Sequence, residues 1–102
     1  MKLYRYQQDY GRMGDLDGVF IADETDLKWF MGAEVWVDDV LGKHSEIQVT
    51  FNENTVKELA VSEQAVQELF DVLGKDVSGM TPYSLDYLIE EWHGERDEED
   101  DE

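Results

Sequence analysis

The sequence predicts an α+β domain in which a small antiparallel sheet packs against two to three helices, in the approximate order ββαβββαα. Two observations favour this class. Short apolar segments separated by turns occupy residues 2–61, and the clearest of them alternates apolar and polar positions. Apolar residues at helical spacing dominate residues 62–94, where a capping residue precedes each helix.

The first two expected strands are short. Residues 2–8 are rich in tyrosine, which favours strands, and residues 19–22 form a second apolar segment. Three glycines between residues 11 and 18 predict a loop that joins the two strands.

A short helix is expected next, because Asp23 or Thr25 can serve as its N-cap and Gly32 can end it. Further strands follow, with turns between them at residues 42–45 and 52–55. These strands are expected at residues 34–41, 46–51 and 56–61.

Two helices are expected at the C-terminal end. Ser62 caps the first helix and Gly74 stops it. Thr81 is the expected N-cap of the second, Pro82 its first residue and Gly94 its end. One face of this second helix is an apolar stripe, because Leu85, Leu88, Ile89 and Trp92 recur at helical spacing.

The three tryptophans have different expected environments. Trp92 belongs to the apolar stripe, so we expect it in the core. Trp29 fits either the core or a surface. Trp36 lies between Val35 and Val37 on an expected strand, where neighbouring side chains point to opposite faces. If only one face of that sheet is covered, either Trp36 or the valine pair is exposed.

The charge of the chain is its most unusual property. It has 26 acidic and 8 basic residues in 102, a net charge of −18. Residues 95–102 contain seven acids and one arginine, so they contribute −6, and the other 94 residues keep −12. We expect a single acidic domain over residues 1–94 and a disordered acidic tail over 95–102. Such a charge repels nucleic acid and anionic membranes and attracts cationic surfaces.

Other features of the composition exclude several classes of protein. The chain has no cysteine, which excludes disulfides and thiolate metal sites. No apolar run approaches the roughly 18 residues of a membrane span, and the N-terminus lacks the apolar stretch of a signal peptide. We therefore expect a cytoplasmic protein of one domain.

Asp15 and Asp17 invite a calcium interpretation, because clustered carboxylates bind hard cations. An EF-hand loop that starts at Asp15 would need a glutamate at its twelfth position, which is Asp26. A glycine-rich hairpin loop is the alternative that we favour. No metal is expected.

Catalytic motifs are also weak. His44, Ser45 and Glu46 are the residue types of a hydrolase triad, but neighbours on a strand point to opposite faces. The glycines of residues 11–18 lack the Walker spacing and its lysine. We expect no catalytic residue, no cofactor and no enzymatic activity.

Carboxylates recur on the expected outer faces of the domain. Those two apart on a strand lie about 6.6 Å from each other, and helical i, i+4 pairs about 5–6 Å. Duplex DNA has one charge per roughly 1.7 Å of its axis, so a folded acidic surface can occupy a groove lined by Lys and Arg. The residues that we expect to bind a partner are Asp23, Glu24, Asp26, Asp38, Asp39, Asp86, Glu90 and Glu91.

The short length, the body charge of −12 and the acidic runs at 23–26, 90–91 and 95–101 form a recognisable combination. In these features the chain resembles the small acidic inhibitors of phages and mobile elements, including DNA-mimic and anti-CRISPR proteins. The resemblance implies occlusion of the nucleic-acid channel of a CRISPR effector, a restriction enzyme or a transcription enzyme. Residues 40–47 also resemble a segment of small uncharacterised bacterial and phage proteins.

We therefore expect an acidic inhibitor that binds a basic, nucleic-acid-binding enzyme in the cytoplasm of a bacterial host. It would contact neither nucleic acid nor membrane directly, and its oligomeric state stays open, a dimer included. One alternative is an immunity protein that neutralises a basic nuclease toxin. Another is a small acidic housekeeping or metal-binding domain. A solvated surface or a salt-adapted source would explain the acidity without any partner.

Overall fold

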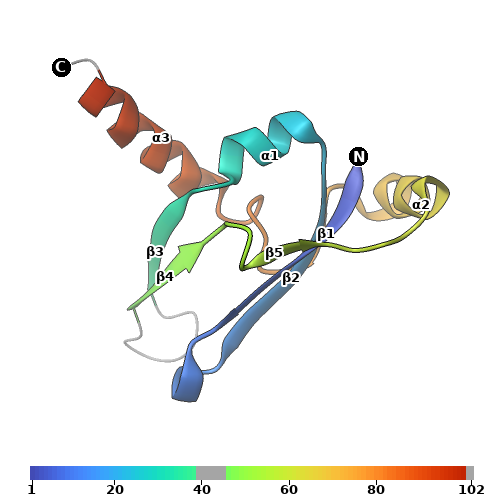
Figure 1. Ribbon diagram of the computed structural model, residues 1–102, viewed down its shortest axis with the longest axis horizontal. Coiled ribbons are helices and arrows are strands. Elements are labelled where there is room, and N and C mark those ends of the chain that lie inside the picture. Colours follow the sequence, from blue (N-terminus) through green and yellow to red (C-terminus); the bar gives the residue numbers. More distant parts are fainter. Residues whose placement is uncertain (39–45, 101–102) are drawn as a thin grey trace.

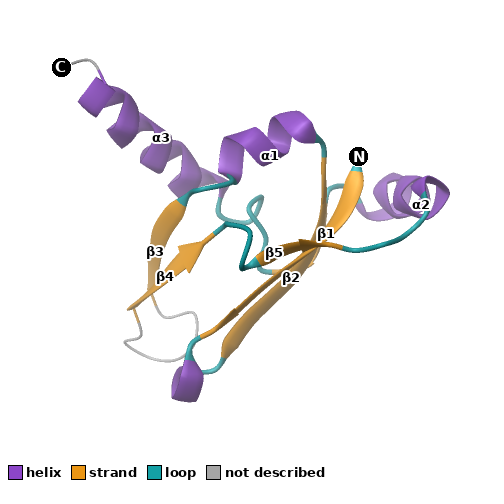
Figure 2. Ribbon diagram, viewed as in Figure 1, coloured by secondary structure: helices purple, strands orange, loops and turns teal. Residues whose placement is uncertain are grey.

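The structure, a computed structural model, describes residues 1–38 and 46–100 and confirms the α+β class (Figures 1 and 2). Within these residues, strands and helices alternate along the chain much as expected. The elements in chain order are β1 (Lys2–Asp9), the short 3-10 helix η1 (Gly11–Met13), β2 (Asp15–Ala22), α1 (Glu24–Phe30), β3 (Glu34–Asp38), β4 (Glu46–Thr50), β5 (Val56–Glu58), α2 (Glu63–Leu73), β6 (Asp76–Gly79) and α3 (Asp86–Asp100).

A four-stranded antiparallel sheet has the order β5-β1-β2-β6. Its centre is the long β1–β2 hairpin, which pairs from Lys2 opposite Ala22 to Asp9 opposite Asp15. β2 therefore begins four residues earlier than the sequence predicts, because β1 offers hydrogen-bonding partners along its whole length. The expected glycine-rich loop shrinks to the single turn of η1.

Strand β6 is an element that the sequence analysis missed. It pairs with β2 although its sequence contains Asp, Ser and Gly, which are rare in strands. The two backbones approach closely at Gly18 and Gly79: a Cβ built on Gly18 would lie 1.9 Å from the carbonyl oxygen of Met80. Glycine at these positions is what permits the β2–β6 pairing.

A separate two-stranded sheet is formed by β3 and β4, with Trp36 opposite Gln48. Side chains of the β1 end link β4 to the larger sheet. The Gln8 Oε1 accepts a hydrogen bond from the Thr50 backbone N–H (3.1 Å), and the Gln48 carbonyl accepts from Gln8 Nε2 (3.3 Å) and the Tyr10 hydroxyl (2.6 Å). The predicted turn at residues 42–45 lies outside the described residues.

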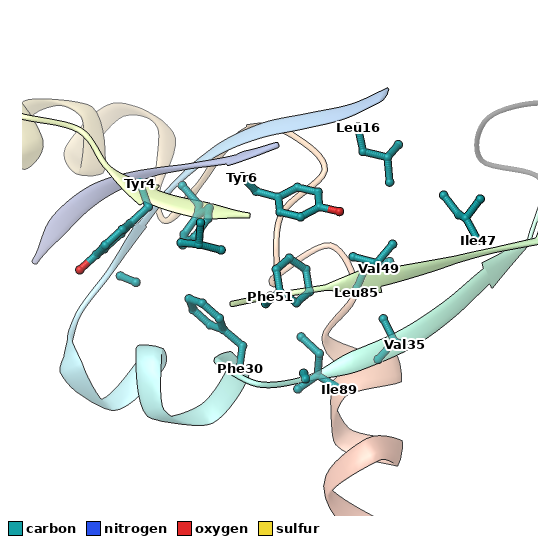
Figure 3. Packing of buried hydrophobic residues seen from close by; sticks show 14 residues of the cluster. Tyr4, Tyr6, Leu16, Phe30, Val35, Ile47, Val49, Phe51, Leu85 and Ile89 are labelled. Atoms are coloured by element: carbon teal, nitrogen blue, oxygen red, sulfur yellow. The ribbon is translucent and has the colours of Figure 1, made fainter. Parts of the chain in front are cut away.

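The main hydrophobic core lies between the two sheets and is closed by α1 and the start of α3. Figure 3 shows Tyr6 and Leu16 of the larger sheet facing the apolar side chains of β4, including Phe51 just beyond it. Phe30 of α1 packs edge-on against Phe51 at a ring distance of 5.9 Å. On the opposite face of the larger sheet, α2 covers a smaller core centred on Ile21.

The ends of the helices agree in part with those predicted from the sequence. Asp23 caps α1, and Ser62 and Gly74 bound α2 as predicted. α3 begins at Asp86 rather than at Pro82, because residues 82–85 form a turn. α3 also passes through Gly94, the predicted end, since this glycine does not take the positive φ of a helix stop. The division into an acidic body and a disordered tail stays a prediction.

Candidate partner-binding site

The acidic residues at the start of α1 are used within the fold. Asp23 accepts a hydrogen bond from the Asp26 backbone N–H at 2.8 Å, which is the N-cap of the helix. The Asp26 carboxylate pairs with the Lys75 ammonium at 2.7 Å and accepts a hydrogen bond from the Tyr83 hydroxyl at 3.0 Å. Glu24 is exposed. Asp23 is thus the N-cap that the sequence predicts, whereas the ion pair of Asp26 with Lys75 was not predicted.

The Asp26–Lys75–Tyr83 contacts change the acidity of all three groups. Burial raises the pKa of Asp26, but the hydrogen bonds from Lys75 and Tyr83 outweigh it and hold the pKa below its ordinary value. The hydrogen bond to Asp26 raises the pKa of Lys75. Burial, reinforced by Asp26, raises the pKa of Tyr83. This cluster ties α1 to the loop before β6 and to the turn before α3.

Four of the remaining predicted acids lie on β3 and α3. Asp38 is exposed at the end of β3, and Asp86, Glu90 and Glu91 are exposed on α3. Asp39 lies outside the described residues. The first turns of α3 begin next to β3, so these two elements form one surface (Figure 1).

The outer face of β3 resolves the question about Trp36. Val35 is buried and Val37 is half-buried, so the valine pair points to the core. Trp36 points outward and is 58% exposed. Glu34 and Asp38 share its face of the strand because they are two residues away on either side.

A groove of about 210 Å³ lies between β3 and α3. We call it the Trp36 groove. It combines apolar and aromatic walls with two carboxylates, and it is lined by Glu34, Val35, Trp36, Leu88, Glu91 and Trp92. Glu91 is one of the acids that the sequence analysis expected to bind a partner, and Glu34 was not among them. The alternation of side chains along β3 would have identified Glu34, because residues two apart on a strand, such as Glu34 and Trp36, share one face.

Three ion pairs form within the described part of the chain, and none involves a residue of β3, β4 or α3. They join Lys2 to Glu58 (3.3 Å), Arg5 to Asp17 (2.5 Å) and Lys75 to Asp26 (2.7 Å).

β3, β4 and α3 have no lysine or arginine before Arg96. Their exposed carboxylates, which we call the β3–β4–α3 acidic set, are Glu34, Asp38, Glu46, Asp86, Glu90 and Glu91. The negative charge of this set is therefore uncompensated by neighbouring bases on the same elements.

Residues with possible metal or catalytic chemistry have other partners. Asp15 and Asp17 lie on β2 rather than in a loop, and Asp17 binds Arg5. His93 places Nε2 at 2.5 Å from the Trp29 carbonyl oxygen and stacks on the Trp29 ring. No group of three or more His, Asp or Glu residues within the described ranges could hold a metal ion. His44 and Ser45 lie outside these ranges.

Two further findings concern the chain as a whole. No helix in residues 1–38 and 46–100 combines the length and the apolar character that crossing a membrane requires. No family model matches the chain, and the comparisons with curated proteins and with solved structures give no match.

Proposed function

We propose that this protein is a binding inhibitor that blocks a nucleic-acid-binding enzyme by presenting carboxylates to the basic groove of that enzyme. The observation that supports the proposal is the β3–β4–α3 acidic set, which is exposed and has no lysine or arginine among its elements before Arg96. An enzyme that binds nucleic acid aligns Lys and Arg side chains with phosphates, and those side chains are what a fixed array of carboxylates attracts.

The proposed partner is a basic protein in the cytoplasm of a bacterial cell, with a defence nuclease or a transcription enzyme as the target class. The inhibitor itself stays away from nucleic acid and from anionic membranes, because a net charge of −18 repels both. Its structured elements hold the carboxylates in fixed positions, so less conformational entropy is lost on binding than with a flexible acidic chain. In this proposal the protein has no catalytic role.

Capture from a bacterial lysate tests the proposal. The protein is immobilised, bound material is eluted by raising the salt concentration, and the eluted proteins are identified. We expect a basic nucleic-acid-binding enzyme that elutes steeply with salt, because screening weakens exposed charge pairs. A nuclease toxin in the eluate would favour the immunity role instead. Salt-insensitive binding that leaves nucleic-acid loading of the target intact would refute the proposal.

The same capture with residues 95–102 deleted separates the contributions of the two acidic regions. We expect binding to persist, since the β3–β4–α3 acidic set remains. Complete loss of binding would move the function to the terminal acidic run and contradict a role for the folded surface.

A further inference from the structure

The exposure of Trp36 is unusual for a tryptophan on a regular strand. The inner face of the same two-stranded sheet is well packed, with Val35 5%, Ile47 4% and Val49 0% exposed. Trp36, on the outer face, leaves 58% of its surface in contact with solvent. An exposed ring of this size gives up the hydrophobic stabilisation that burial would provide. Exposed tryptophans of this kind are typical of binding surfaces.

Among the described residues, the charged side chains on the outer face of β3 and along the Trp36 groove are all acidic. Glu34 and Asp38 lie two residues away on the same strand, about 6.6 Å along it. Glu46 pairs with Asp38 across the sheet, and Glu91 of α3 lines the groove. The contact of Glu34 Oε2 with Gln48 Nε2, at 3.5 Å, is a weak one. The described residues that line the groove include no lysine or arginine.

An aromatic face next to carboxylates selects a cation with a flat surface. A phosphate group would be repelled by the carboxylates, and a purely apolar segment would desolvate them without compensation. The groove, at about 210 Å³, is smaller than the roughly 300–1,000 Å³ of typical small-molecule pockets and suits one side chain. A guanidinium group satisfies both features, because it stacks on tryptophan and pairs with carboxylates through its planar N–H groups.

We propose that the Trp36 groove binds an arginine side chain of the basic partner, with the guanidinium stacked on Trp36 and paired with Glu34 and Glu91. This inference rests on the proposed function, since it names the contact through which the inhibitor would recognise its target. Arginine is preferred over lysine because the lysine ammonium is more strongly hydrated and cannot form the planar double hydrogen bond.

Titration of the full-length protein with an arginine–glycine repeat peptide, and with a lysine–glycine peptide of equal length, tests the inference. We expect the arginine peptide to bind about threefold more tightly. The variant W36A removes this preference, and its fold is checked by circular dichroism. The double variant E34Q/E91Q keeps the shape of the groove and weakens binding of the arginine peptide about tenfold.

A matched control separates the groove from general electrostatic attraction. The double variant E63Q/E68Q removes the same charge from exposed positions on α2, away from the groove, and should weaken binding by about twofold at most. Equal weakening by both double variants, or an arginine preference that survives in W36A, would overturn the inference.

The same variants distinguish this inference from the proposed function. If the wild type blocks nucleic-acid binding by its captured target and W36A blocks it equally well, the groove inference fails and the proposed function stands. If the arginine preference depends on Trp36 but the captured target still loads nucleic acid, the proposed function fails and the groove inference stands.

Discussion

At Gly18 two backbone segments approach so closely that a methyl group has no room. An added Cβ would lie 1.9 Å from the Met80 carbonyl oxygen and 2.6 Å from its carbon, and both are backbone atoms that cannot rotate away. A Cβ added at Gly94 on α3, by contrast, would meet no atom within 4 Å. Two glycines of one chain thus carry very different constraints.

Substitution of these two glycines tests the packing of β6 on β2. We expect G18A to lower the free energy of unfolding by about 3 kcal/mol, because β6 must shift to accommodate the new methyl group. G94A should be neutral or stabilising by about 0.5–1 kcal/mol, since alanine favours helices. Urea unfolding measures both. A G18A midpoint equal to that of the wild type would contradict the close β2–β6 approach.

The Asp26 carboxylate predicts a pH effect on stability. Its pKa in the folded protein lies below the ordinary value of 3.8. Its stabilising contribution is therefore complete above pH 3.8 and is lost as the pH falls through the lower, folded-state pKa. At neutral pH we expect D26N to be about 2 kcal/mol less stable than the wild type.

The pH dependence of this difference is the decisive measurement. Melting temperatures of wild type and D26N should converge as the solution becomes more acidic than pH 3.8. Comparison of the two proteins cancels the general loss of negative charge, which both undergo. The variant E24Q, at an exposed position of the same helix, serves as control, and its melting temperature should lie closer to that of the wild type than that of D26N does at neutral pH. A constant wild type–D26N difference across this range would be inconsistent with the Lys75 and Tyr83 contacts.

At the scale of elements, side chains rather than backbone pairing join the two sheets. Gln8 uses both ends of its amide, accepting from the Thr50 N–H and donating to the Gln48 carbonyl. It also accepts a hydrogen bond from the Tyr6 hydroxyl at 2.7 Å. These contacts hold the β3–β4 sheet, and with it the Trp36 groove, at a fixed position beside the β1–β2 hairpin.

Removal of the Gln8 amide tests this connection. We expect Q8A to lower the free energy of unfolding by about 2 kcal/mol, because the Thr50 N–H and the Tyr6 hydroxyl lose their acceptor, while the Gln48 carbonyl keeps only the Tyr10 hydroxyl. Hydrogen exchange at the Thr50 N–H should accelerate as well. Gln7 is exposed and lies next in sequence, so Q7A is the matched control, with little expected effect. Unchanged exchange at Thr50 in Q8A would show that the Gln8 contact does not hold β4.

The elements that sequence patterns predicted are those whose stability is local. Ser62 and Gly74 mark α2 because capping acts within a few residues, and β4 alternates cleanly because one face is buried. β6 could not be predicted in the same way. Its end residues Asp76 and Gly79 are poor strand formers, and it exists because β2 offers a free edge that the glycines at 18 and 79 allow it to reach.

The candidate site likewise combines features that depend on local sequence with features that depend on tertiary packing. Exposed acids on α3 were predictable because the apolar stripe of the helix defines its outer face. The use of Asp26 inside the fold was not, since Lys75 and Tyr83 are distant in sequence and their approach depends on tertiary packing. The meeting of Trp36 with Glu91 likewise depends on where α3 lies relative to β3.

At the scale of the whole molecule, the charge has an energetic cost. A net charge of −18 on 102 residues produces self-repulsion that opposes the compact state. Two of the three ion pairs of the described residues, Lys2–Glu58 and Arg5–Asp17, are exposed and contribute about 0–1 kcal/mol each, so they offset little of it. We interpret the retention of uncompensated carboxylates on β3, β4 and α3 as a feature of binding.

In the proposed function, this protein competes with nucleic acid for one basic surface of its target. The most direct measurement is the affinity of the purified, captured target for a nucleic-acid duplex, titrated with increasing amounts of the full-length protein at several salt concentrations. We predict that the protein displaces the duplex competitively and that its own affinity falls steeply as salt rises. A ternary complex of target, duplex and this protein, or displacement that is indifferent to salt, would contradict the claim.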